Sequence, residues 1–315
     1  MSRFALRRLL QLPLVLLGIS LVVFGLMALL PGDTAVALLG PYATPERIAE
    51  LRAELGLDRP LPVRYASWLG RVVRGDLGHS TSLERPVADE LVERGAATAL
   101  LAATAFALAT LGGVAAGAAA ARFRDRLADH VIGALAVAGL STPPFWLAML
   151  AVLAFAVALP WFPVSGMRAT VGGGGALDVL RHLVLPAAVL SVVAGSVIAR
   201  VTRTAMLETA RAEFVRVARA RGLPERRVWL AHVLRPALVQ VVPVIGLQAG
   251  YVIGGALYVE TVFSWPGLGR SLVEAVAARD LLLVQGGALV MAVAYVTVNL
   301  AADLVQAALD PRIRR

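Results

Sequence analysis

Six stretches of this 315-residue chain are apolar, almost free of charge and long enough to cross a bilayer as helices. The first, residues 9–30, holds 22 uncharged residues and would extend about 33 Å as a helix. The other stretches are residues 96–121, 131–159, 183–206, 237–259 and 284–309. This pattern predicts an all-α membrane protein with six transmembrane helices.

The third stretch is interrupted, because Pro143 and Pro144 stand side by side near its middle. Each proline removes a backbone donor and disfavours the helical conformation of the residue before it. We therefore expect a kink or a break in the third span at these prolines.

All 30 basic residues are arginine, and their placement predicts the orientation of the spans. Arginine dominates the N-terminus, residues 122–130, residues 200–236 and the tail, residues 310–315. Residues 200–236 alone hold nine arginines against three acidic residues. By the positive-inside rule these four segments lie in the cytoplasm, so both termini are expected there.

Residues 31–95, between the first two spans, have the pattern of a folded external segment. Thr44, Pro45 and Glu46 are typical of a helix start, and Gly56 is expected to end that helix. A second helix is predicted from one apolar face, made of Leu61, Tyr65, Trp68, Leu69 and Val72. The segment is either a platform for an external partner or a cap packed on the spans, and the two interpretations are compatible.

The composition argues against several kinds of catalytic and binding site. Without lysine there is no P-loop, and without cysteine there is no disulfide, thiolate ligand or cysteine nucleophile. The four histidines are far apart in the sequence. We therefore expect a chain that is not an enzyme and that holds no metal and no cofactor. The net charge is +9, but the arginines that produce it flank the spans. We therefore expect the lipid bilayer to be a partner of this chain and expect no nucleic-acid partner.

The long loop of residues 206–236 has a pattern of its own. Apolar residues at steps of three and four predict a helix with one apolar face. These residues are Leu207, Ala210, Phe214 and Val217. Gly222 is expected to cap this helix, and Pro224 to open a second helix that ends near Arg235 and Pro236. Two helices around a glycine corner would fill a groove on a cytosolic partner; the alternative is a basic helix lying on anionic lipid.

Several segments carry a family resemblance, in the same order along the chain. The run Arg216-Val217-Ala218-Arg219-Ala220-Arg221-Gly222, continued by His232-Val233-Leu234-Arg235-Pro236, resembles the EAA loop of ABC importer permeases. Further matching segments are Leu30-Pro31-Gly32-Asp33, Glu54-Leu55-Gly56-Leu57-Asp58, Gly75-Asp76-Leu77-Gly78, residues 260–270 and Leu309-Asp310-Pro311-Arg312. On these motifs the chain is identified as a member of the dipeptide/oligopeptide/nickel permease family. It departs from the general motif at Arg216-Val217-Ala218, where the motif has Glu-Ala-Ala, and at Arg235-Pro236, where it has Leu-Pro.

The resemblance implies a type I ABC importer permease fold in the bacterial inner membrane, importing dipeptides or oligopeptides. It implies four kinds of partner: a second homologous permease, two ABC ATPase subunits, an extracytoplasmic solute-binding protein and the bilayer. ATP and Mg would be held by the ATPase chains. Coupling to these ATPases is assigned to Arg216, Val217, Ala218, Arg219, Ala220, Arg221, Gly222 and Pro224.

Small and polar residues in the fifth and sixth spans are candidates for the translocation path or for helix packing. They are Gly246, Gln248, Gly250, Gly254 and Asn299. Gly113 and Gly117 form a similar pair in the second span, and Asp303 is expected to have an interfacial role.

A tight turn and a short helix are predicted before the sixth span. The residues involved are Trp265, Pro266, Gly267, Gly269 and Arg270. We expect them to form an outer gate, a contact with the delivered binding protein, or a structural plug.

The sequence thus divides into an N-terminal stub with the first span (1–30), the external segment (31–95), a core of five spans (96–309) and a cytoplasmic tail (310–315). Related permeases for nickel or glutathione-like solutes are an alternative function. A stand-alone ion-coupled transporter is a second alternative, against which stand the lack of matching half-repeats and the scarcity of acidic residues in the spans.

Overall fold

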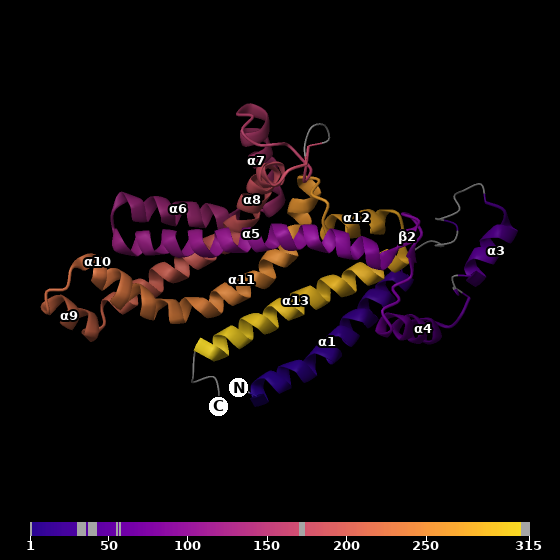
Figure 1. The fold of residues 1–315 in the computed structure, drawn as a ribbon, viewed down its shortest axis with the longest axis horizontal. Coiled ribbons are helices and arrows are strands. Elements are labelled where there is room, and N and C mark those ends of the chain that lie inside the picture. Colours follow the sequence, from indigo (N-terminus) through magenta and orange to yellow (C-terminus); the bar gives the residue numbers. More distant parts are fainter. Residues whose placement is uncertain are drawn as a thin grey trace. The chain divides into compact units, whose positions relative to one another are not determined.

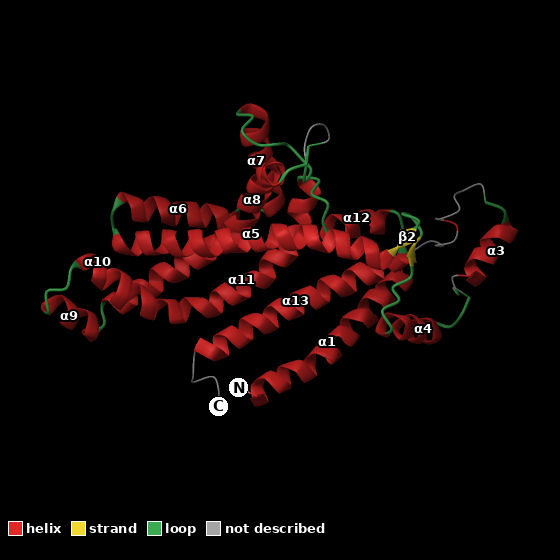
Figure 2. Cartoon of the chain, viewed as in Figure 1, coloured by secondary structure: helices red, strands yellow, loops and turns green. Residues whose placement is uncertain are grey.

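The computed structural model describes residues 2–29, 36, 43–54, 56, 58–169 and 174–309, and most of them are helical (Figures 1 and 2). Some residues of the family motifs lie outside the described residues. They are Leu30–Asp33, Leu55, Leu57 and the tail from residue 310.

Five helices of the described chain are long and apolar enough to span a membrane. They are α1 (Ser2–Leu29), α5 (Val87–Arg122), α8 (Ala176–Ala210), α11 (Arg235–Val262) and α13 (Leu281–Leu309). A sixth crossing is formed if α6 (Leu127–Ser141) and α7 (Pro144–Ala151), with the π-helix η1 (Val152–Ala158), make one broken span. Every predicted span therefore falls on a helix.

The break in the third span is confirmed. Its two parts meet at an angle of 113°. Thr142 and Pro143 between them are extended, with ψ of 125° and 135°. Both residues precede a proline, whose ring excludes the helical conformation at the position before it.

The described chain forms two compact units, each made of segments that are distant in the sequence. Unit 1 comprises Met1–Ala5, Thr98–Pro266 and Tyr295–Arg315. Unit 2 comprises Leu6–Ala97 and Gly267–Ala294.

In unit 1, α8 is the central helix and contacts α6, α7 and α11. Glycines let α5 and α6 approach it closely, at Gly113, Gly117 and Gly139. A β-carbon on Gly113 would lie 2.7 Å from the carbonyl oxygen of Gly195 and 2.9 Å from Cβ of Ile198. The glycine pair of the second span is therefore placed in helix packing.

Two neighbouring glycines of α5 test this packing. We expect Gly113→Ala to lower the free energy of unfolding by about 1–3 kcal/mol, because its methyl group overpacks the contact with α8. Gly112→Ala should be neutral or slightly stabilising, because nothing lies within 4 Å of its β-carbon position and alanine favours helix over glycine. The temperature at which each detergent-solubilised variant loses monodispersity measures this, and equal midpoints would contradict the packing.

Unit 2 contains the external segment predicted between the first two spans. Its elements are α3 (Pro45–Glu54), α4 (Leu61–Val73) and a hairpin of β1 (His79–Ser80) and β2 (Arg85–Pro86), joined by α12 (Leu268–Ala277). Both predicted helices are present, and Gly56 follows α3 with φ of +64°. The hairpin was not predicted, since two-residue strands leave no alternating pattern.

Helix α4 packs on the first span through aromatic rings. Phe24 of α1 lies 5.4 Å from Tyr65 and 5.8 Å from Trp68, measured between ring centroids. The Tyr65 hydroxyl also forms a 2.8 Å hydrogen bond with Ser20. Of the predicted apolar face of α4, Trp68 is thus buried and Tyr65 half-buried beside α1, whereas Leu61 stays exposed.

Candidate coupling loop and translocation residues

The loop between α8 and α11 begins with a break that the sequence did not predict. Helix α8 ends at Ala210, and α9 (Glu213–Ala220) starts after Ala212, whose ψ of 148° is extended. The predicted single helix, with Leu207, Ala210, Phe214 and Val217 on one face, is therefore wrong. Neither glycine nor proline marks the break, so the periodicity gave no sign of it.

Helix α9 has two apolar faces with different surroundings. Val215 and Ala218 are buried, and α9 packs against η2 (Val228–Leu234). Phe214 and Val217 stay 49% and 44% exposed. The chain itself thus covers one apolar face of α9 and leaves the predicted face open.

The corner after α9 is a left-handed cap centred on Gly222. Its φ is +74°, and its N–H donates to the carbonyl of Arg219 at 2.9 Å. The N–H of Leu223 donates to the carbonyl of Ala218 at 3.4 Å, which completes a Schellman motif. A 2.9 Å ion pair between Arg219 and Glu225 spans the corner. The predicted glycine cap is confirmed.

The second half of the loop continues into the fifth span without a stop. Pro224 precedes α10 (Glu225–Arg227) in an extended conformation, and η2 then runs directly into α11. The predicted end near Arg235 and Pro236 is therefore wrong. Proline lacks an N–H and crowds the carbonyl four residues earlier, and the wider π turn before Pro236 accommodates both effects. The loop and the fifth span form one continuous helical rod.

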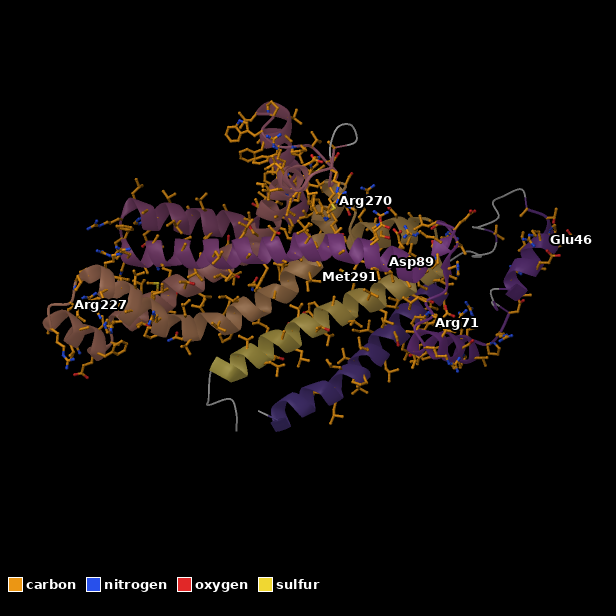
Figure 3. All side chains as sticks on the ribbon, in the orientation of Figure 1. Glu46, Arg71, Asp89, Arg227, Arg270 and Met291 are labelled. Atoms are coloured by element: carbon orange, nitrogen blue, oxygen red, sulfur yellow. The ribbon has the colours of Figure 1, made fainter. Side chains whose placement is uncertain are left out.

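The loop contacts the end of α5, and the arginines at its corner are exposed. The guanidinium of Arg122, at the end of α5, lies 5.5 Å from the centroid of the Trp229 ring. Figure 1 shows α9 and α10 beyond the ends of α5 and α6, and Figure 3 shows Arg227 on this projection. The exposed residues of the corner include Arg216, Ala220, Arg221 and Gly222.

The candidate residues of the fifth and sixth spans do not share one environment. A β-carbon on Gly246 would lie 2.8 Å from Cβ of Ala302, and one on Gly250 would lie 3.0 Å from the Asn299 side-chain nitrogen. Gly254 has nothing within 4 Å of its β-carbon position. Gln248 and Asp303 are half-buried. Two of the three glycines therefore pack against α13.

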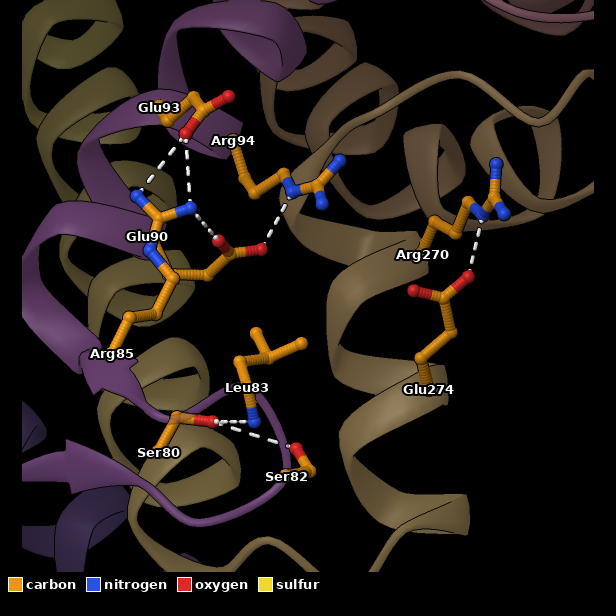
Figure 4. A network of polar contacts seen from close by, with 9 residues as sticks. All are labelled: Ser80, Ser82, Leu83, Arg85, Glu90, Glu93, Arg94, Arg270 and Glu274. Atoms are coloured by element: carbon orange, nitrogen blue, oxygen red, sulfur yellow. Dashed lines mark hydrogen bonds and ion pairs between the residues drawn. The ribbon is translucent and has the colours of Figure 1, made fainter.

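The turn before the sixth span contains one residue that is far from any surface. Trp265 is fully buried, and its backbone N–H donates to the carbonyl of Glu260 at 2.9 Å. Gly267 caps α12, and Gly269 is buried within that helix. Pro266 is half-buried, and Arg270 forms a 2.7 Å ion pair with Glu274 (Figure 4). Of the predicted gate residues, Arg270 is thus half-buried and ion-paired, whereas Trp265 is fully buried.

Two family models match the sequence of this chain. The model described as binding-protein-dependent transport system inner membrane component matches residues 113–315. The model of the N-terminal part of such membrane components matches residues 1–100. The chain belongs to this family.

Relatives match this transport component along its whole length. A Brucella ovis protein named as a peptide permease is 41% identical over 317 residues, covering 100% of this chain and 99% of its own. The dipeptide transport system permease protein DppB of Escherichia coli K12 is 39% identical over 336 residues, with coverage of 100% and 99%. Among solved structures, the inward-facing MetNI methionine ABC transporter has a TM-score of 0.54 at 17% identity, covering 70% of this chain and 96% of that chain. The predicted type I importer permease fold is confirmed.

Among the residues that the structure describes, no group of three or more histidines or carboxylates could hold a metal ion. Several ionisable side chains of this transport component form ion pairs or hydrogen bonds with one another. Glu90, at the start of α5, is buried between Arg85 and Arg94, at 2.8 Å and 2.6 Å, and Arg85 also reaches Glu93 (Figure 4).

Sequence reasoning missed a buried aspartate that joins the hairpin to the last helix. Asp280 is fully buried and caps α13, accepting a 3.1 Å hydrogen bond from the N–H of Leu283. Its second oxygen accepts bonds from the Ser80 hydroxyl at 2.6 Å and from the Ser82 hydroxyl and N–H at 2.8 and 3.0 Å. Burial raises the pKa of Asp280, but these hydrogen bonds to the carboxylate outweigh it and hold the pKa below its ordinary value. The sequence does hold one signal for this role: Asp280 stands directly before an apolar run, which is typical of a residue that caps the start of a helix.

The lowered pKa of Asp280 predicts a pH dependence with a definite sign. Its stabilisation is fully present above the unfolded pKa of about 3.9 and is lost as the pH falls through the lower folded value. We expect faster amide hydrogen exchange at Ser82 and Leu283 in Asp280→Asn than in the wild type. The difference should be constant from pH 7 to 5 and should shrink below pH 4. A difference that persists unchanged to pH 2 would contradict this role.

A second missed pair lies in unit 1. Asp129 of α6 is buried and accepts two hydrogen bonds from Arg203 of α8, at 2.6 and 2.7 Å. It also accepts a 3.1 Å bond from the N–H of Asp125. The pair joins residues 74 positions apart, so no local pattern marked it.

Proposed function

We propose that this chain is the transmembrane permease subunit of an ATP-driven ABC importer, translocating dipeptides or oligopeptides. The observation that carries the proposal is the loop of α9, the Gly222 corner and the rod of α10, η2 and α11. Relatives that match the full length and are named as peptide or dipeptide permeases support the peptide class.

The loop has the properties of a lever for a partner ATPase. The exposed Phe214 and Val217 offer an apolar surface, and Ala220 and Gly222 allow close approach at the corner. The Schellman cap and the ion pair of Arg219 with Glu225 stiffen the corner. Because η2 continues into α11, a movement of the loop would reach the fifth span directly.

The partner chains would supply the functions that this chain lacks. Two ABC ATPases would bind ATP and Mg and dock on the loop, a second homologous permease would complete the path, and an extracytoplasmic solute-binding protein would deliver the peptide. Arg270 of α12, half-buried and paired with Glu274, is a candidate for contact with that binding protein. The arginine-rich segments support a cytoplasmic location for both termini.

Mild-detergent affinity purification from native membranes tests this assignment. We expect the ATPases, a second permease and a binding protein to co-purify, and the reconstituted complex to import peptide only with ATP. Nickel or glutathione uptake in place of peptide would favour those related permeases. Transport by this chain alone, driven by an ion gradient, would overturn the proposal in favour of a secondary transporter.

Orientation is tested separately by a protease-cleavable tag at the C-terminus. In intact spheroplasts the tag should be protected, and it should be cleaved after the membrane is permeabilised. Cleavage in intact spheroplasts would contradict the cytoplasmic placement of the termini.

A further inference from the structure

A groove with both apolar and polar lining lies in unit 1 between α8 and α11, near the end of α8 that leads into the loop between these helices. Its volume is about 410 Å³, and its polar lining is Arg200, Thr204 and Glu208 of α8 with Gln240 of α11. Small-molecule sites in proteins have volumes of about 300–1,000 Å³. The groove is therefore large enough for a small solute.

The two charges of the groove are not used by the fold. Arg200 and Glu208 are exposed, and neither side chain forms an ion pair or hydrogen bond within the described part of the chain. The nearby Arg203 of the same helix, by contrast, is held by Asp129. An unpaired charge is costly in contact with lipid, and both residues lie in the segment 200–236 that is predicted to be cytoplasmic. This face of α8 therefore meets water, a solute or another chain.

The rise along α8 between Arg200 and Glu208 is comparable to the length of a short peptide. Arg200 and Glu208 are eight residues apart on one helix, which is about 12 Å at 1.5 Å per residue. Side chains on a helix pair directly when they are three or four residues apart. Arg200 and Glu208 are about two turns apart and do not neutralise each other in this way. An extended peptide of two to four residues spans about 7–14 Å. Its terminal carboxylate and ammonium are the groups that arginine and glutamate bind best.

We propose that this groove is a transit subsite for the two charged ends of a short peptide, with Arg200 binding the carboxylate and Glu208 the ammonium. The inference rests on the proposed import of peptides and names the residues of this chain that touch them. Gln240 lines the groove beside these charges and can donate to or accept from the peptide backbone. The Thr204 hydroxyl donates to the Arg200 carbonyl and can accept a hydrogen bond from the peptide. Contacts to the termini are independent of side chains, so such a subsite accepts peptides of any sequence.

Charge reversal in the reconstituted four-component complex tests the subsite with radiolabelled trialanine. We expect Arg200→Glu and Glu208→Arg each to lower uptake per ATP hydrolysed about tenfold, as the loss of a charge-assisted hydrogen bond would. Assembly and binding-protein-stimulated ATPase activity should stay at wild-type levels. The double reversal should recover at least half of the uptake, because a zwitterion can bind in the opposite direction.

A matched control and the contrary outcomes complete the design. Arg181→Gln removes an exposed charge from the same helix outside the groove and should leave uptake unchanged. Unchanged uptake in both single reversals would overturn the subsite, and so would lost assembly that the double reversal does not restore, which would assign the charges to a partner chain. If the wild-type complex hydrolyses ATP but imports no trialanine, the proposed peptide function fails instead.

Thiol labelling gives a readout that does not depend on turnover. The chain has no cysteine, so Thr204→Cys introduces a single thiol into it. We expect a water-soluble methanethiosulfonate to label this thiol in the complex, and trialanine supplied with its binding protein and ATP to slow the labelling at least threefold. Thr104→Cys in α5 is the matched control, since both threonines donate to the carbonyl four residues earlier. If peptide does not slow the labelling of the Thr204→Cys variant, the subsite is overturned.

Discussion

Gly222→Asp is expected to abolish ATP-linked uptake while the complex still assembles in the membrane. Nothing lies within 4 Å of the Gly222 β-carbon position, so the new side chain meets no neighbour in the chain itself. The backbone cost of a left-handed conformation is about 1–2 kcal/mol for a residue other than glycine, which the fold can absorb. The carboxylate would instead project from the corner that we assign to the ATPase groove, where close approach is required. Peptide uptake into proteoliposomes, together with pull-down of the ATPases, measures both effects.

A second glycine provides the matched control for this variant. Gly75 has φ of +83° and equally free space around it, but it lies in unit 2, between the first two spans. Gly75→Asp carries the same backbone cost and should keep uptake within about twofold of the wild type. Normal uptake in Gly222→Asp would refute the assignment of the loop, and an equal loss in Gly75→Asp would show that backbone strain alone is responsible.

Arg203→Leu is expected to destabilise unit 1 by about 3 kcal/mol. Its removal leaves the buried Asp129 carboxylate without the two hydrogen bonds of 2.6 and 2.7 Å. Breaking a buried pair by removing one partner costs about 3–5 kcal/mol, because the remaining charge stays buried. Heat-induced loss of monodispersity in detergent, followed by size-exclusion chromatography, measures the change.

Two further variants separate the buried charge from the general loss of an arginine. Arg124→Leu breaks a pair with Asp125 that is 47% and 75% exposed, and it should cost less than about 1 kcal/mol. The double variant Asp129→Asn with Arg203→Leu should recover part of the stability, because no buried charge remains. If the double variant is less stable than Arg203→Leu, the Asp129 charge is not the cause.

Several features of this chain are encoded locally. The apolar runs predict every span, Pro143 and Pro144 predict the break in the third, and Gly222 predicts the corner. Each depends on one side chain or on a short periodic pattern. Bilayer thickness sets the length of one continuous apolar run. The steric effect of proline and the left-handed preference of glycine act on the residue itself and its chain neighbours.

The loop between α8 and α11 shows where local patterns stop being sufficient. Phe214 and Val217 have helical spacing, yet α9 buries Val215 and Ala218 instead, because η2 covers that face. Pro236 reads as a helix end, yet the π turn before it carries the helix on into the fifth span. In both cases packing against a neighbouring element outweighs the preference of the sequence.

The sequence by itself determined that this chain is a helical membrane permease with a glycine-cornered loop between its fourth and fifth spans. Only the tertiary structure decided which polar groups meet: Asp280 with the hairpin serines, Asp129 with Arg203, and the groove that Arg200 and Glu208 share with Gln240. The reason is physical, since helix and turn preferences arise between residues a few positions apart. Buried ion pairs and grooves, by contrast, exist only once distant helices have packed.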